Sequence, residues 1–249
     1  YKDSINNKSN QKNIGVIKSS NLCAEIVEYS EKDETAVCNL ASIALPKFVT
    51  DEGKYDYQDL YQVAKLATKN LDQVIDINFY PTDKTENSNS RHRPIGLGIQ
   101  GLADVFAMLK IPFGSEKAAN INEHIFETIY HASLQQSMEM AKSRGVLMEK
   151  LKTLEANIID TSVDIDTGKK QAMTNEIASL RKFLRPIDAE LNRDTHLGSY
   201  STFLDSPLHN GKLQFDLWNK DALGSYNWNF LREDIIKYGV RNSLLVAPM

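Results

Sequence analysis

Residues 20–45, SNLCAEIVEYSEKDETAVCNLASIAL, hold both cysteines of the 249-residue chain. Cys23 stands in the polar setting NLCAE, whereas Cys38 belongs to AVCNLASIAL, a short and largely apolar run. Such a run predicts a buried strand. Strands and helices in alternation are typical of an α/β fold, so this stretch decides the fold class if helices flank it.

The segments after this stretch predict helices and further strands. A helix predicted over 116–144 has Ser115 as its N-cap and Gly145 just past its end. A strand is predicted in NSLLVAP, residues 242–248, after a helix that Gly239 ends. The remaining segments are a helix over residues 57–79, which ends before Pro81, and a buried strand or turn leading into a helix over 95–110.

Two regions differ in character from the rest. Residues 1–13 are rich in Asn, Lys and Ser, which predicts a loop or frayed end. Residues 146–197 carry Leu and Ile at coiled-coil spacing in two arms, joined by the turn-forming DTSVDIDTGKK. A helical hairpin is the simplest interpretation, and Pro186 should kink or break its second arm.

Composition excludes several classes of function. The net charge of −4 and pI near 5.8 leave no basic surplus for nucleic acid. No run of eighteen apolar residues occurs, so no membrane span is expected, and the start is too polar for a signal peptide. Two cysteines make no disulfide framework, which favours a reducing cytoplasm. There a cysteine serves either packing or chemistry.

Two motifs favour a structural interpretation over a functional one. GLGIQG, residues 96–101, matches the dinucleotide-binding pattern, but NSNSRHRP precedes it instead of a buried strand, so close backbone packing is favoured. His124, Glu127 and His131 would share one helix face and could bind metal. No supporting metal motif accompanies them, so they are predicted on the solvated side of the helix, with no metal site.

NLCAE also permits a chemical interpretation. In an extended or looped segment, Asn21, Cys23 and Glu25 would present their side chains to one side. An amide can hold hydroxyls, a carboxylate can take a proton, and the sulfur can exchange a hydrogen atom. The carboxylate opposes thiolate formation, which suits a neutral thiol or a thiyl radical. An Asn and a Glu in a surface loop beside a buried Cys remains the alternative.

Ordered motifs along the chain resemble one family. SNLCAEI, AVCNLAS, RHRPIGLGIQGLAD, IFETIYHASL, SPLHNGKLQFDLW and YGVRNSLLVAPM are similar to successive segments of the large, catalytic subunit of class I ribonucleoside-diphosphate reductase, in its eukaryotic and viral branch. The resemblance runs from about residue 20 to residue 249, apart from residues 146–197.

The resemblance implies a role for each matching residue. Cys23 would become the thiyl radical that abstracts the ribose 3′ hydrogen, and Glu25 would deprotonate the 3′ hydroxyl. Asn21 would hold the sugar hydroxyls, and Cys38 would be one half of the redox pair that ends as a disulfide. Leu22 and Met249 would join Asn21 and Glu25 in binding substrate.

The resemblance further implies a portion of a ten-stranded α/β barrel, with a finger loop at residues 21–25 and an inserted helical hairpin. The expected divisions are a flexible segment (1–19), a first barrel segment with the finger loop (20–145), the insertion (146–197) and a second barrel segment (198–249). The other redox cysteine and the phosphate loop are missing, so the chain should be inactive alone.

Cofactors and partners are also implied. No cofactor is expected on this segment, but the full enzyme would need a small radical-generating subunit that contains metal, ATP or dNTP effectors, and thioredoxin or glutaredoxin. Its other partners would be the ribonucleoside diphosphate, the rest of the large subunit and a second large subunit. The competing hypothesis is a non-catalytic scaffold whose hairpin binds a partner.

Overall fold

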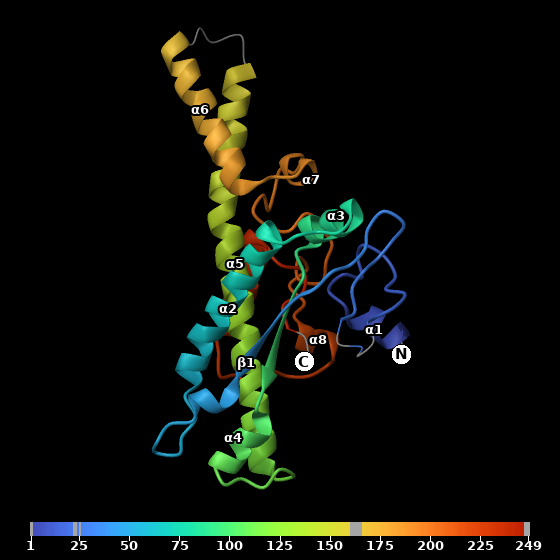
Figure 1. Ribbon diagram of the computed structural model, residues 1–249, viewed down its shortest axis with the longest axis vertical. Helices are drawn as coiled ribbons and strands as arrows, with labels where there is room; N and C mark the ends of the chain where they lie inside the picture. The colour runs from blue at the N-terminus through green and yellow to red at the C-terminus, as the bar shows by residue number, and fades with distance from the viewer. Residues whose placement is uncertain (1, 22–23, 25, 160–165, 247–249) are drawn as a thin grey trace.

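A computed structural model describes residues 2–21, 24, 26–159 and 166–246. Figure 1 shows a long central helix with the other elements gathered mainly around its lower two thirds. The elements, in chain order, are α1 (Lys2–Lys8), β1 (Asn39–Ala44), the 3-10 helix η1 (Leu45–Phe48), α2 (Tyr57–Ile77), α3 (Asp83–His92), β2 (Ile95–Gln100), α4 (Leu102–Met108), α5 (Glu116–Ile159), α6 (Thr167–Leu184), α7 (Asp188–Leu191), α8 (Gln214–Leu217) and α9 (Trp228–Tyr238).

The two strands are parallel, with Asn39 of β1 opposite Ile95 of β2. Helices α2 and α3 make the crossover that a parallel pair requires. The C-terminal segment continues the pattern, because the Leu97 N–H donates to the Leu245 carbonyl at 2.9 Å. The α/β class is therefore confirmed, as are the strands predicted next to Cys38 and in residues 95–110. Of the strand predicted over 242–248, the described residues form an isolated parallel bridge between Val246 and Leu97, and the last two residues lie outside the described ones.

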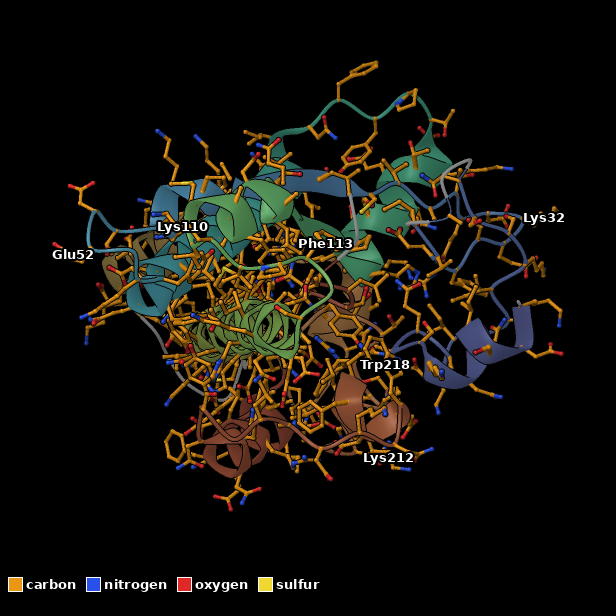
Figure 2. The ribbon with its side chains drawn as sticks, turned by 90° about the horizontal axis from the view of Figure 1, so that it is seen from below. Lys32, Glu52, Lys110, Phe113, Lys212 and Trp218 are labelled. Atoms are coloured by element: carbon orange, nitrogen blue, oxygen red, sulfur yellow. The ribbon has the colours of Figure 1, made fainter. Side chains whose placement is uncertain are left out.

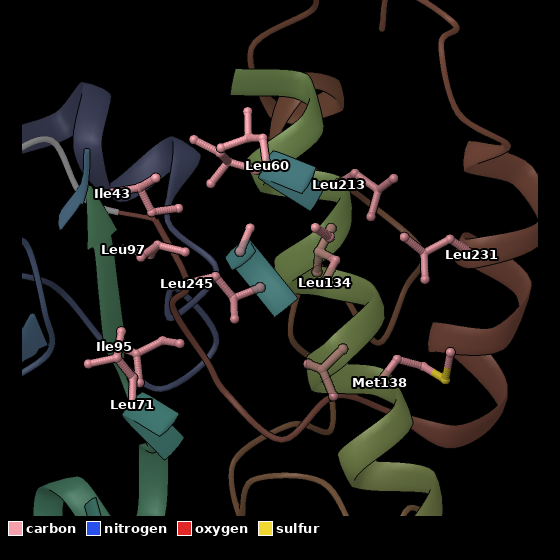
Figure 3. Packing of buried hydrophobic residues seen from close by; sticks show 14 of the residues in the cluster. Ile43, Leu60, Leu71, Ile95, Leu97, Leu134, Met138, Leu213, Leu231 and Leu245 are labelled. Atoms are coloured by element: carbon pink, nitrogen blue, oxygen red, sulfur yellow. The ribbon is translucent and has the colours of Figure 1, made fainter. Parts of the chain in front are cut away.

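The main hydrophobic core lies where α2, β2, α5 and α9 meet (Figure 3). Its side chains are almost fully buried, and each buried Leu or Ile contributes about 1.5–3 kcal/mol. Figure 2 looks nearly along α5 and shows α2 on one side of it and the C-terminal segments on another. Members of the core labelled in Figure 3 include Leu60 and Leu71 of α2, Ile95 and Leu97 of β2, Leu134 and Met138 of α5, and Leu231 of α9.

Helix α5 does not end before Gly145, so that aspect of the sequence prediction was wrong. It continues without a break to Ile159. Gly145 has no positive φ, and a Cβ placed on it would lie 3.6 Å from the Gly198 backbone nitrogen. An alanine Cβ would therefore fit at Gly145, whereas a Cβ on Gly198 would lie 1.8 Å from the Ala141 carbonyl oxygen, so the close approach of the two segments depends on Gly198.

The helical hairpin is confirmed. Helix α6 packs back along the end of α5, and Met148, Leu151 and Leu184 form a small core between them. Arg185 takes a left-handed conformation with φ 43° and ends α6 directly before Pro186, as the proline requires. Gly198 next to Gly145 brings the ends of residues 146–197 together, the geometry expected of an insertion. That the segment is an insertion stays a prediction.

The hairpin segment is nevertheless tied to the core at its end. Glu190 is 1% exposed and accepts hydrogen bonds from Arg144 and Arg241, each at 2.9 Å. A residue of the 146–197 segment is thus buried in the interior beside Arg241. Two buried guanidinium groups need the charge of Glu190, and this explains why the chain returns to the core before Gly198.

The N-terminal residues are more ordered than their composition predicts. A loop or frayed end over 1–13 was wrong for the described residues, because Lys2–Lys8 form α1. Asn10 and Gln11 are buried and hydrogen-bond to Ser243. The segment has few apolar side chains, so buried hydrogen bonds from its polar side chains, which replace bonds to water, fix it to the rest of the protein. Among the described helices, none is both long and apolar enough to cross a bilayer.

Candidate active site

The loop predicted to carry the chemistry begins with a turn that Asn21 closes. The Ile26 N–H donates to Asn21 Oδ1 at 3.0 Å, and the Ala24 N–H donates to the Asn21 carbonyl at 3.1 Å. Ala24 has φ 62°, a left-handed conformation that costs a non-glycine residue about 1–2 kcal/mol. Strain of this kind concentrates at functional sites.

Four of the residues given a role by the sequence lie outside the described residues. They are Leu22, Cys23, Glu25 and Met249. Their predicted roles stay predictions. Asn21 and Cys38 are described, and so are most of the residues between them.

Cys38 is a half-buried thiol immediately before β1, and its Sγ lies 3.9 Å from the Asn39 carbonyl oxygen. The carboxyl group of Glu28 contacts this thiol. Glu28 is 6% exposed, and burial raises its pKa to about 7, while the Cys38 thiol acts in the opposite direction. A buried acid that titrates near neutrality therefore adjoins the predicted redox cysteine.

A buried ionic cluster fixes the loop between Glu28 and Cys38. Glu34 is 7% exposed, pairs with Arg91, and lies 2.5 Å from His92 Nε2. His92 Nδ1 is 2.8 Å from Thr202 Oγ1, which joins α3 to the C-terminal half. The loop before Cys38 is thus held on the end of α3.

The N-terminal and C-terminal segments meet behind this loop. Gln11 Oε1 accepts the Tyr29 N–H at 2.8 Å, and Gln11 Nε2 donates to Ser243 Oγ at 3.0 Å. One side chain therefore links Tyr29, which follows the site turn, to Ser243 near the other end of the chain. Residues far apart in sequence therefore meet beside Tyr29, the residue that follows Glu28.

The histidines of α5 form no metal site in the described residues. His131 is 7% exposed, so its predicted place on the solvated side was wrong. Its Nδ1 is 2.8 Å from the Tyr61 hydroxyl, and its ring stacks on Tyr226 with centroids 4.6 Å apart. Burial lowers the pKa of His131 to about 4, so the ring packs as a neutral aromatic group.

GLGIQG also has a structural role. Gly96 and Gly98 lie within buried strand β2, whereas a dinucleotide fingerprint places its glycines after the strand. Gly101 has φ 81°, and a Cβ there would lie 2.6 Å from Pro46 Cδ. Close backbone packing is the correct interpretation for Gly101.

The comparisons with known proteins identify the family. Residues 1–249 match the sequence profile described as "Ribonucleotide reductase, barrel domain". The chain belongs to this family. It is 46% identical over 254 residues to the "Ribonucleoside-diphosphate reductase large chain 2" of Saccharomyces cerevisiae, covering 100% of the chain and 23% of that protein.

Other relatives give the same result. The chain is 45% identical over 249 residues to the "Ribonucleoside-diphosphate reductase large subunit" of Caenorhabditis elegans, and 43% identical over 249 residues to that of variola virus. In both cases all of the chain and 25% of the relative are covered. The chain therefore spans about a quarter of the length of these curated relatives.

Sequence reasoning missed Glu28, which contacts Cys38, and the Glu34–His92 contact, which holds the loop between them. Glu28 looked like one of many charged residues in EIVEYSEKDE, and nothing in its spacing distinguishes it from Glu31. The Glu34–His92 contact joins residues far apart in sequence. RHRP could have indicated it, since a histidine between two arginines attracts carboxylates, but not which carboxylate.

Proposed function

We propose that this chain belongs to a large, catalytic subunit that reduces ribonucleoside diphosphates to 2′-deoxyribonucleoside diphosphates. The observation that carries the proposal is the match of the whole chain to the barrel domain and to proteins named as large subunits. The proposed catalytic residues lie in the segment from Asn21 to Cys38.

Three residues would act on the sugar. Cys23, as a thiyl radical, takes the 3′ hydrogen atom, and Glu25 takes the 3′ hydroxyl proton as the 2′ hydroxyl leaves as water. Asn21 holds the sugar hydroxyls. What the structure supplies for this proposal is that Asn21 is itself held in place, because it accepts hydrogen bonds from the N–H groups of Ala24 and Ile26.

Cys38 would supply reducing electrons together with a second thiol. With two cysteines in the 249 residues and Cys23 used for hydrogen transfer, that second thiol lies outside this sequence. A half-buried thiol at the start of β1 suits this task, because the strand fixes its position. Cys23 and Cys38 must not bond to each other, since a disulfide would remove both reacting groups.

The proposed reaction also requires groups beyond this chain. A small subunit with a metal centre would generate the radical, and a thioredoxin-type dithiol would reduce the disulfide again. A second large subunit and ATP or dNTP effectors complete the proposed assembly. Leu22 and Met249 would contact the substrate beside Asn21 and Glu25.

The test is conversion of substrate by an assembled enzyme. The chain is expressed within a complete large subunit of a close relative, in place of the matching segment, and mixed with that relative's small subunit. A ribonucleoside diphosphate should then be converted to its deoxy form in the presence of a dithiol. A correctly folded chimera that binds substrate but makes no product, beside an active parent enzyme, would count against the proposal.

A further inference from the structure

Among the described residues, Glu28 is the buried carboxylate of this region without an ionic partner. Neither of its oxygens accepts a hydrogen bond of ordinary geometry from those residues, although the side chain is 6% exposed. Its neighbours differ: Glu34 forms an ion pair with Arg91 and contacts the ring of His92, and Glu31 forms an ion pair with Lys18. A carboxyl group buried in this way is costly when charged and needs a reason.

The contact of Glu28 is the Cys38 thiol. Among the titratable groups of the described residues, Cys38 is the one whose interaction favours the charged form of Glu28, and burial opposes it. The thiol is itself half-buried at the start of β1. An acid and a thiol thus share a protected site, and the thiol lowers the cost of ionising the acid.

We propose that Glu28 is the proton donor and acceptor for Cys38 when this thiol passes between its reduced and disulfide forms. The inference rests on the proposed function, in which Cys38 is a redox-active cysteine. Glu28 would touch the reacting sulfur and would therefore be a catalytic residue of the re-reduction step.

The Cys38 disulfide is reduced by thiol–disulfide exchange. A thiolate of an external dithiol attacks the other sulfur of the Cys38 disulfide and forms a new S–S bond. The old S–S bond breaks, and its electron pair goes to the Cys38 sulfur. The carboxylic acid of Glu28 gives its proton to that sulfur, and solvent later protonates the carboxylate again. The dithiol is oxidised by two electrons once its second thiol completes the exchange.

The burial of Glu28 sets the acid strength for this step. With a pKa of about 7, the group holds its proton for roughly half of the time at neutral pH. It can therefore give a proton to a departing thiolate and recover it, which a carboxyl group with the ordinary pKa of 4.5 does rarely. Cys38 would be released as a thiol and not as a charged group in a half-buried site.

The test uses the 249-residue chain with Cys23→Ser, so that Cys38 is the reacting thiol. Methyl methanethiosulfonate converts Cys38 to a methyl disulfide, and dithiothreitol then releases it. The release rate is measured from pH 5.5 to 9 and divided by the concentration of dithiothreitol thiolate. Whichever sulfur is attacked, the departing thiolate lies beside Glu28.

We expect the normalised rate to fall about tenfold, the equivalent of one pKa unit, with a midpoint near pH 7 as Glu28 loses its proton. Glu28→Gln should remove this fall and give a flat, slower profile. Glu28→Asp keeps a carboxyl group and should retain the fall. Asp33→Asn removes an exposed carboxylate of the same loop and should leave the profile unchanged.

A fall that persists in Glu28→Gln would overturn the inference. A flat profile in the Cys23→Ser chain with Glu28 intact would also overturn it, so the test does not depend on the folding of the glutamine variant. The assay contains no nucleotide and no small subunit. Its failure would therefore leave the proposed reductase function standing, and failure of the reductase assay would leave this result standing.

Discussion

Replacing Gly145 with alanine tests whether α5 is one continuous helix. The added Cβ would lie 3.6 Å from the Gly198 nitrogen and 4.0 Å from its Cα, both ordinary contacts. Glycine in a helix interior costs about 0.5–1 kcal/mol relative to alanine. Gly145→Ala should therefore raise the free energy of unfolding by about that amount, and the melting temperature by roughly 1–4 °C for a chain of this size.

Two further glycines make the assay specific. Gly53 has φ +71° with nothing within 4 Å, so Gly53→Ala isolates backbone strain and should destabilise by about 1–2 kcal/mol. Gly198→Ala would place a Cβ 1.8 Å from the Ala141 carbonyl oxygen and should destabilise by about 3 kcal/mol or more. Urea and thermal unfolding followed by circular dichroism measure all three. If Gly145→Ala behaves like Gly53→Ala, then Gly145 ends a helix and the continuous α5 is refuted.

The remaining predictions concern a buried charge, a buried histidine and a catalytic base. Glu190→Gln should lower the free energy of unfolding by about 3 kcal/mol, because it leaves buried Arg144 and Arg241 without their counter-charge. Glu176→Gln, which breaks an exposed ion pair, should change it by under about 1 kcal/mol. Equal urea midpoints for the two variants would contradict this prediction. Because burial lowers the pKa of His131 from 6.5 to about 4, its contribution to stability is complete above pH 6.5 and is lost as the pH falls toward 4, by up to about 3 kcal/mol. His131→Gln should reduce this slope in a series of unfolding curves without abolishing it, because buried His92, whose pKa is also lowered to about 4, contributes over the same pH range. An unchanged slope would exclude His131 as one of its sources. In the assembled enzyme, Glu25→Gln should lower turnover by about 100-fold or more with little change in substrate binding, and a rate near wild type would remove Glu25 from the role of base.

The strands and the hairpin could be predicted because their signals are local. AVCNLASIAL is apolar and of strand length, and the structure forms β1 there. The repeated Leu and Ile of the hairpin have a face to bury, and Met148, Leu151 and Leu184 bury it. Where each segment supplies its own periodic apolar face, the sequence suffices.

The sequence predictions were wrong where the local structure depends on contacts with a segment far away in the chain. Gly145 resembles a helix end until Gly198 is placed against it. Asn10 and Gln11 belong to a polar stretch that resembles a loop, and their partner Ser243 comes from the other end of the chain. Local composition has no information about such partners.

The candidate site shows the same division. NLCAE and its distance to Cys38 could be singled out from the sequence, but the roles predicted for their residues came from the resemblance to the family and stay predictions. The burial of Glu28 could not, since it depends on how residues 26–38 fold back over the thiol. Folding brings one ordinary glutamate among several to the reacting sulfur.

A single turnover without external reductant tests the central claim, that Cys23 transfers a hydrogen atom and Cys38 supplies electrons. The assembled enzyme is mixed with a ribonucleoside diphosphate, quenched, and alkylated, and the Cys38 peptide is quantified by mass spectrometry beside the deoxy product. We predict one Cys38 thiol lost for each deoxynucleotide formed, and neither product nor loss of the thiol in Cys23→Ser. Product formation by Cys23→Ser, or full alkylation of Cys38 after product has formed, would contradict the account.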